Sequence, residues 1–283
     1  MIVHEPGALR SLARERRAAG CRVALVPTMG ALHKGHGELI RAAAAAAETV
    51  VVSVYVNPRQ FNVTSDFEKY PRDLASDVAA AAASGATVVY APHDSVMYPE
   101  GFDTTVSVRG VAAPLEGAGR PGHFDGVATV VAKLLNACDP DTAVFGLKDY
   151  QQVAVVRRMV RDLDMSVEII AVDTVREPDG LALSSRNIRL SPEDRAAAPV
   201  VHRGLLRARE VLECGGDARS AREGFLSVVS ESGRARVEYV SVADPDTLVE
   251  TEDPPSRAVI SCAVWFGDVR LIDNVLHGVP GAP

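Results

Sequence analysis

The stretch Val23-Ala24-Leu25-Val26-Pro27-Thr28-Met29-Gly30-Ala31-Leu32-His33-Lys34-Gly35-His36 decides the fold. Its apolar start, Val23–Val26, predicts a strand, and the glycine-containing segment after it leads into an alanine-rich helix. In open α/β folds, ligands bind at the carboxyl ends of parallel strands, where a helix N-terminus offers N–H groups and a partial positive charge. The segment is therefore a candidate phosphate site, at which His33 and His36 can direct their imidazoles to one phosphate group.

The alternation of β-branched runs with helical stretches extends from Arg22 to about Val172 and predicts a Rossmann-like parallel sheet of the α/β class. The expected strands are Val23–Val26, Val50–Val56, Thr87–Tyr90, Ala143–Phe145 and Val167–Val172, and the expected helices are Gly37–Glu48, Asp73–Ser84, Gly126–Ala137 and Tyr150–Asp162. The unbroken hydrophobicity of Val50–Val56 predicts a strand that is buried on both faces.

A different order of elements follows Val172. Charged helices are expected at Pro192–Cys214 and Ala218–Ser230, followed by strands at Val237–Val242, Ala258–Phe266 and Val269–Ile272. Helices followed by strands indicate a separate, smaller α+β domain. We therefore expect a ligand-binding domain over residues 1–174 and a C-terminal lid domain over residues 175–283.

The composition of the 283 residues, with 47% hydrophobic residues and a formal charge of −7, is that of an ordinary globular protein. The acidic charge disfavours nucleic acid and anionic membranes as partners. Four dispersed cysteines and no apolar run of about 20 residues lead us to expect a soluble, cytoplasmic protein with reduced thiols.

The pattern around the two histidines admits other interpretations. The spacing of Gly30 and Gly35 is that of a P-loop, but His36 stands where that motif requires lysine. Two surface histidines in a capping loop are a plain alternative, and a histidine metal pair is another, although no third ligand stands at a suitable spacing.

Polar side chains also follow other predicted strands. Asn57 and Gln60 follow one strand, and their uncharged amides suit a small hydroxy acid, although Asn-Pro is also a common turn former. Lys148 follows another strand and can meet phosphate charge. Asp149 is expected to cap the next helix or to accept from ribose hydroxyls, and Gln152 lies one turn further on.

Five ordered segments resemble the pantothenate synthetase family, which belongs to the nucleotidylyltransferase superfamily with its HxGH signature. They are Pro27–His36, Asn57–Phe61, Tyr70–Arg72, Gly146–Gln152 and Leu183–Asn187, and the resemblance continues weakly to Leu271–Asn274. It implies an ATP-dependent ligation of pantoate and β-alanine to pantothenate through a pantoyl-adenylate, with release of AMP and pyrophosphate. It also implies Mg2+ as the companion of ATP, and a homodimer.

The resemblance also implies roles for single residues. The catalytic set is His33, His36, Lys148, Ser184, Ser185 and Arg186, and the ATP-binding set is Met29, Gly30, Gly35, Gly146, Asp149, Val175 and Leu183. Pantoate is expected at Asn57, Gln60 and Gln152, with Met29, Phe145 and Val131 as apolar walls. Arg120 and His123 are expected to act on β-alanine or in a lid, and Asp77 is the candidate Mg2+ ligand.

Some features of the sequence limit these expectations. Gly117–Gly122 formally matches the dinucleotide fingerprint GxGxxG, but no predicted strand precedes it and Pro121 interrupts it. Arg120 can also be a solvated loop residue, and Leu147 stands where the family usually has Glu. Another nucleotidyl transferase of the superfamily and a non-catalytic nucleotide-binding protein remain alternative functions.

Overall fold

The computed structural model describes residues 1–62, 67–253 and 255–279 and divides into two compact units. The first unit comprises residues 1–146 and 152–172, and the second comprises residues 147–151 and the chain from 173 onward. Each unit is described by itself. The short segment at 147–151 belongs to the second unit although it precedes the last strand of the first, which a boundary near residue 174 does not anticipate.

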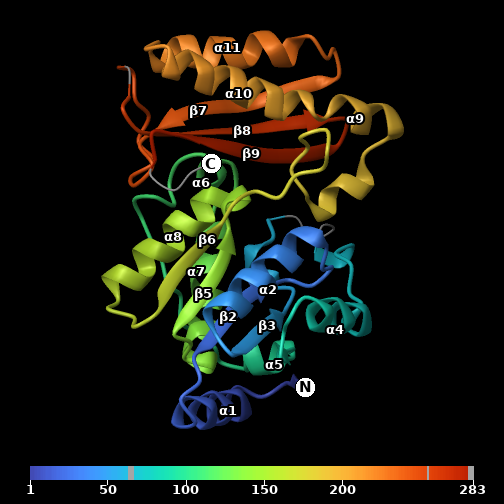
Figure 1. Ribbon diagram of the computed structural model, residues 1–283, viewed down its shortest axis with the longest axis vertical. Coiled ribbons are helices and arrows are strands. Elements are labelled where there is room, and N and C mark those ends of the chain that lie inside the picture. The colour runs from blue at the N-terminus through green and yellow to red at the C-terminus, as the bar shows by residue number, and fades with distance from the viewer. Residues whose placement is uncertain (63–66, 254, 280–283) are drawn as a thin grey trace. The chain divides into compact units, whose positions relative to one another are not determined.

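The first unit contains a parallel sheet of six strands in the order β1-β4-β3-β2-β5-β6 (Figure 1). The strands are β1 Ile2–Val3, β2 Val23–Thr28, β3 Thr49–Val54, β4 Val88–Tyr90, β5 Thr142–Gly146 and β6 Glu168–Val172. The helices α2 (Lys34–Ala46) and α4 (Leu74–Ala83) pack against each other and the sheet, whereas α1 (Pro6–Ala18) and α7 (His123–Cys138) pack against each other and β2.

Both faces of the central strands are buried, as the run of valines in β3 predicts. Val50 and Val52 belong to the core cluster that contains residues of α2 and α4. Val51 points to the other face of the pleat and is also fully buried. The first unit also contains α5 (Asp94–Met97), α6 (Glu116–Gly119), the 3-10 helix η1 (Pro58–Gln60) and most of α8 (Tyr150–Asp162).

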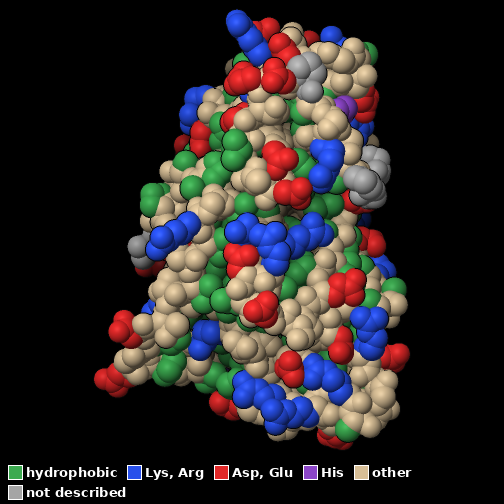
Figure 2. Space-filling view, turned by 90° about the vertical axis from the view of Figure 1, so that its left-hand side faces the viewer, with side chains coloured by type: hydrophobic (Ala, Val, Ile, Leu, Met, Phe, Trp, Pro, Cys, Tyr) green, Lys and Arg blue, Asp and Glu red, His purple; other side chains and the backbone are tan. Residues whose placement is uncertain are grey.

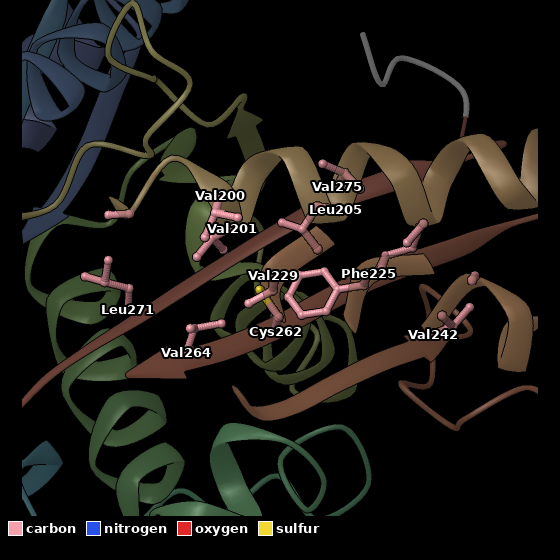
Figure 3. Close-up of a cluster of buried hydrophobic side chains, with 14 of the residues drawn as sticks. Val200, Val201, Leu205, Phe225, Val229, Val242, Cys262, Val264, Leu271 and Val275 are labelled. Atoms are coloured by element: carbon pink, nitrogen blue, oxygen red, sulfur yellow. The ribbon is translucent and has the colours of Figure 1, made fainter. Parts of the chain in front are cut away.

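The second unit is an antiparallel sheet of three strands, β7-β8-β9, packed with helices. Its strands are β7 Ala235–Ala243, β8 Ala258–Phe266 and β9 Val269–His277, its helices are α9 Pro192–Ala197, α10 Val200–Glu213 and α11 Ala218–Ser230, and its 3-10 helices are η2 Leu147–Asp149 and η3 Ser185–Arg189. Figure 3 shows its core, in which Phe225 of α11 and Leu205 of α10 lie among side chains of the sheet such as Val264.

The predicted fold class is confirmed, and the element bounds differ in places. The helix expected over Pro192–Cys214 is two helices, because Pro199 lacks an N–H and separates α9 from α10. The helix α1 was not predicted, although Pro6 at its first position is a common start signal. The strand β9 runs five residues beyond the predicted end at Ile272, to His277.

Charged side chains of both signs are mixed over the face shown in Figure 2. Pairs one helical turn apart, such as Arg158 with Asp162 and Arg219 with Glu223, form ion pairs. Within the described part of the chain, none of the helices has the length and apolarity that crossing a bilayer requires.

Candidate active site

The two histidines of the HxGH segment cap the first residues of α2. The loop from β2 turns through Gly30 (φ +82°) and Ala31 (φ +52°), and His33 is the N-cap residue. His33 Nδ1 accepts the N–H of Gly35 at 3.1 Å, and His36 Nδ1 accepts the N–H of His33 at 3.3 Å. Because a backbone N–H can only donate, Nε2 carries the proton in both rings. The centroids of the two imidazole rings lie 4.1 Å apart, so two neutral ring N–H donors stand close together at the N-terminal, positive end of α2.

Asp77 of α4 holds this loop in place. Its carboxylate accepts the N–H of Ala31 at 3.1 Å and the N–H of Leu32 at 2.8 Å, and the residue is only 4% exposed. A Cβ at Gly30 would lie 2.6 Å from Asp77 Oδ2, so the close approach needs glycine there. The predicted role of Asp77 as a Mg2+ ligand stays a prediction, and its visible contacts are those of a loop anchor.

An amide pair, Asn57 and Gln60, lies beside the same loop. Asn57 is 1% exposed and caps η1, so the turn interpretation of this residue holds as well. Its Nδ2 donates to Gln60 Oε1 at 3.0 Å and to the carbonyl oxygen of Gly126 at 3.1 Å. Gln60 Nε2 in turn contacts Met29 Sδ at 3.0 Å. The amide niche and the start of the HxGH loop therefore share Met29.

Arg120 and His123 are tied to the backbone of the amide pair. Arg120 Nη2 donates to the Gln60 carbonyl oxygen at 3.1 Å, and His123 Nδ1 lies 2.8 Å from the same oxygen. Since that oxygen only accepts, Nδ1 carries the proton of the His123 ring, and Nε2 accepts from Arg120 Nη1 at 3.2 Å. The segment with the GxGxxG match begins in the four-residue helix α6 and ends in the turn before α7, and the preceding strand, β4, ends far upstream at Tyr90.

Lys148, Ser184 and Arg186 line one pocket of the second unit. Lys148 lies in η2 with its Nζ 3.8 Å from Asp149 Oδ1. Ser184 is the N-cap residue of η3, and its Oγ accepts the N–H of Arg186 at 3.2 Å. Ser185 is the first residue of η3. The two basic residues predicted for phosphate binding in this unit, Lys148 and Arg186, thus line the same pocket, whereas the two histidines belong to the first unit.

The remaining predicted residues occupy several settings. Leu183 N–H donates to the carbonyl oxygen of Val175 at 2.9 Å, which closes the loop before η3. Phe145 is 3% exposed and belongs to the interior of the first unit. Gln152 is half-buried in α8. The ligand roles of these residues stay predictions, as do those of Gly35, Gly146 and Val131.

Three residues that the sequence reasoning gave no role support the site residues. Asn274 Nδ2 donates to the carbonyl oxygens of Leu147 and Lys148 at 2.8 and 2.9 Å and so fixes the segment that carries the lysine. Tyr98 Oη donates to Asn57 Oδ1 at 2.7 Å. His202 lines the pocket of Lys148, and burial, together with the nearby Arg176, lowers its pKa. Asn274 lies in the weakly matching segment Leu271–Asn274, which was its only signal in the sequence.

Comparison with known proteins gives one consistent result. The sequence profile described as pantoate-beta-alanine ligase matches residues 1–276. The chain is 47% identical over 270 residues to the pantothenate synthetase of Moorella thermoacetica, with 95% of both chains covered. It is 51% identical over 266 residues to that of Chloroflexus aggregans, with 93% of this chain and 96% of the relative covered.

Solved structures agree with the sequence relatives. The pantothenate synthetase of Thermus thermophilus superposes with a TM-score of 0.91 at 46% identity, covering 97% of this chain and 98% of that one. The pantoate-beta-alanine ligase of Francisella tularensis, complexed with beta-gamma ATP and beta-alanine, gives a TM-score of 0.80 at 34% identity, covering 98% and 97%.

Proposed function

The chain belongs to the pantoate-beta-alanine ligase family, and from this premise we propose how its own residues perform the family's reaction. The reaction joins pantoate to β-alanine at the expense of ATP, which gives pantothenate, AMP and pyrophosphate. A carboxylate and an amine in water form a salt rather than an amide, so the carboxylate must first be activated. We assign the activation to a pantoyl-adenylate.

The observation that carries this proposal is the contact of Gln60 Nε2 with Met29 Sδ. It places the amide pair against the residue that precedes Gly30 of the HxGH loop. A hydroxy acid held by these amides therefore has its carboxylate near a loop suited to the phosphates of ATP. Positioning of this kind converts a bimolecular attack into an effectively unimolecular one.

In the first step, a carboxylate oxygen of pantoate attacks the α-phosphorus, and the bond to the pyrophosphate oxygen breaks. The Nε2–H groups of His33 and His36 donate to phosphate oxygens on which negative charge increases. In the second step, the amine of β-alanine attacks the acyl carbon, AMP leaves with the bonding electrons, and the amine loses a proton to solvent. Neither step needs a covalent enzyme intermediate.

We assign phosphate binding also to Lys148, Ser184, Ser185 and Arg186. Lysine offers a point charge, and arginine can hold phosphate oxygens with two parallel bonds. Arg120 is proposed to meet the carboxylate of β-alanine, since a guanidinium presents N–H donors in a planar fork that matches the two oxygens of a carboxylate.

Among the residues described, no group of three metal-ligating side chains is present, and the Asp77 oxygens accept loop N–H groups. We propose that Mg2+ arrives as the ATP complex, because it commonly keeps several waters and binds through substrate phosphates.

Four free cysteines accord with a cytoplasmic site of action. A homodimer is also proposed, which light scattering of the purified protein tests.

The deciding experiment is exchange of labelled pyrophosphate into ATP. We expect exchange that depends on pantoate and does not require β-alanine, since the adenylate forms before the amine reacts. Exchange with a different acid would reassign the substrate to that of another nucleotidyl transferase. Absence of exchange with every acid tested would favour a non-catalytic nucleotide-binding protein.

A further inference from the structure

Tyr98 lies directly after α5 and reaches the amide pair from outside the family-like segments. Its Oη donates to Asn57 Oδ1 at 2.7 Å, the shortest hydrogen bond that Asn57 makes. We propose that Tyr98 is a positioning residue for pantoate: it fixes the orientation of the Asn57 amide, and through Asn57 that of Gln60. This inference rests on the proposed function, because it takes the amide niche as the place where the hydroxy acid binds.

The orientation of the Asn57 amide follows from groups that have one hydrogen-bonding role only. The backbone N–H of Arg59 can only donate, and it lies 3.3 Å from the Asn57 atom assigned as Oδ1. The carbonyl oxygen of Gly126 can only accept, and it lies 3.1 Å from Nδ2. A flipped amide would set donor against donor and acceptor against acceptor in a site that is 1% exposed.

The orientation of Gln60 follows from that of Asn57. Asn57 Nδ2 donates to Gln60 Oε1, so the NH2 group of Gln60 is the part that faces Met29. A thioether sulfur is a weak acceptor, and a carboxylate or hydroxyl oxygen is a stronger one. The end of this chain of bonds therefore offers a donor to the ligand and selects a ligand that presents an oxygen acceptor, as a hydroxy acid does.

The ring of Tyr98 is held independently of its hydroxyl group. The Arg59 guanidinium carbon lies 4.6 Å from the ring centroid, and the Phe102 ring packs edge-on at 5.1 Å. Tyr98→Phe therefore keeps the ring packing and removes only the donor to Asn57. Without that donor, Asn57 Oδ1 keeps the longer bond from Arg59 N–H, and the Gln60 amide is less firmly oriented before the substrate arrives.

The test compares Tyr98→Phe with Tyr90→Phe. Tyr90 is a matched control in the same unit, because its hydroxyl is buried and has no hydrogen-bond partner among the described residues. For Tyr98→Phe we expect the pantoate KM in the exchange assay, and its Kd in calorimetric titration, to rise about five- to tenfold, the effect of losing one hydrogen bond. The ATP KM should stay near that of the wild type, and the melting temperature should fall by only a few degrees, as the loss of one internal hydrogen bond implies. Tyr90→Phe should change none of these values.

A double-mutant cycle separates positioning from general destabilisation. In an Asn57→Ala background, adding Tyr98→Phe should raise the pantoate KM no further, because the group on which it acts is gone. If Asn57→Ala does not fold, Gln60→Ala provides the background. A pantoate KM of Tyr98→Phe within twofold of the wild type, or an equal rise in either background, would overturn the proposal. A wild type without pantoate-dependent exchange would instead remove the proposed function and this inference together.

Discussion

Replacing Asp77 by asparagine should weaken the hydrogen bonds that hold the HxGH loop against α4. The carboxylate accepts N–H groups from Ala31 and Leu32, one on each oxygen. Asparagine has one oxygen and one NH2 group, so one of the two loop N–H groups would then face a donor. A hydrogen bond to a charged group contributes about 1.5–3 kcal/mol, and a buried donor left unsatisfied costs about 1–3 kcal/mol. We expect the free energy of unfolding of the first unit to fall by about 2–4 kcal/mol.

Asp73→Asn is the matched control, since it is the same substitution on the same helix. Asp73 is the exposed N-cap residue of α4, and its carboxylate accepts the N–H of Ser76 at 3.0 Å. Asparagine caps helices about as well as aspartate, so this variant should change stability by less than about 0.5 kcal/mol. Urea unfolding followed by circular dichroism measures both variants. The only tryptophan, Trp265, lies in the second unit and reports that unit separately.

Hydrogen exchange gives the local readout. The amides of Ala31 and Leu32 should lose protection in Asp77→Asn and keep it in Asp73→Asn. Equal stability of the two variants, with both loop amides still protected, would refute the anchoring role. If Asp77→Asn is as stable as the wild type but needs over ten times more Mg2+ for activity, Asp77 acts as the metal ligand that the sequence predicted.

Further predictions concern charge in both units. His36→Ala and Lys148→Ala should each lower turnover at least about a hundredfold in the exchange assay, because each removes a preorganised donor to phosphate, and near-normal turnover would exclude that residue from catalysis. Asp273→Asn should lower the free energy of unfolding, measured in urea, by about 3–5 kcal/mol, because it leaves the largely buried charge of Arg176 uncompensated. Arg176 donates to the two Asp273 carboxylate oxygens at 2.6 and 3.0 Å. A decrease below about 1 kcal/mol would contradict this prediction. Burial lowers the pKa of His202 below its ordinary 6.5, so the unfolded chain takes up the proton first as the pH falls. The contribution of His202 to the free energy of unfolding is therefore fully present above pH 6.5 and is lost as the pH falls through the folded-state pKa. His202→Gln should make the free energy of unfolding depend less steeply on pH in this range. An unchanged pH dependence would assign the effect to other groups.

The fold was predictable because its signals are local. Apolar runs such as the one before Pro27 mark strands without knowledge of their neighbours, and the turn to helices followed by strands marks the second unit. Three of the family-like segments indicated the candidate site because they lie at the ends of β2, β3 and β5. The break at Pro199 shows the limit of coarse assignment, since the proline signal was present and the charged pattern on both sides concealed it.

The supporting contacts could not be predicted in this way, because they join residues that only the folded chain brings together. Tyr98 and Asn57 are 41 positions apart, and Asn274 is 126 positions from Lys148. Neither the tyrosine nor the second asparagine lies in a pattern that implies hydrogen bonding to a site. Both act through a neighbour: one orients an amide and the other fixes the backbone that carries a lysine. The sequence thus identifies residues that can touch a substrate more readily than residues that set their geometry, and the second group decides whether the first is preorganised.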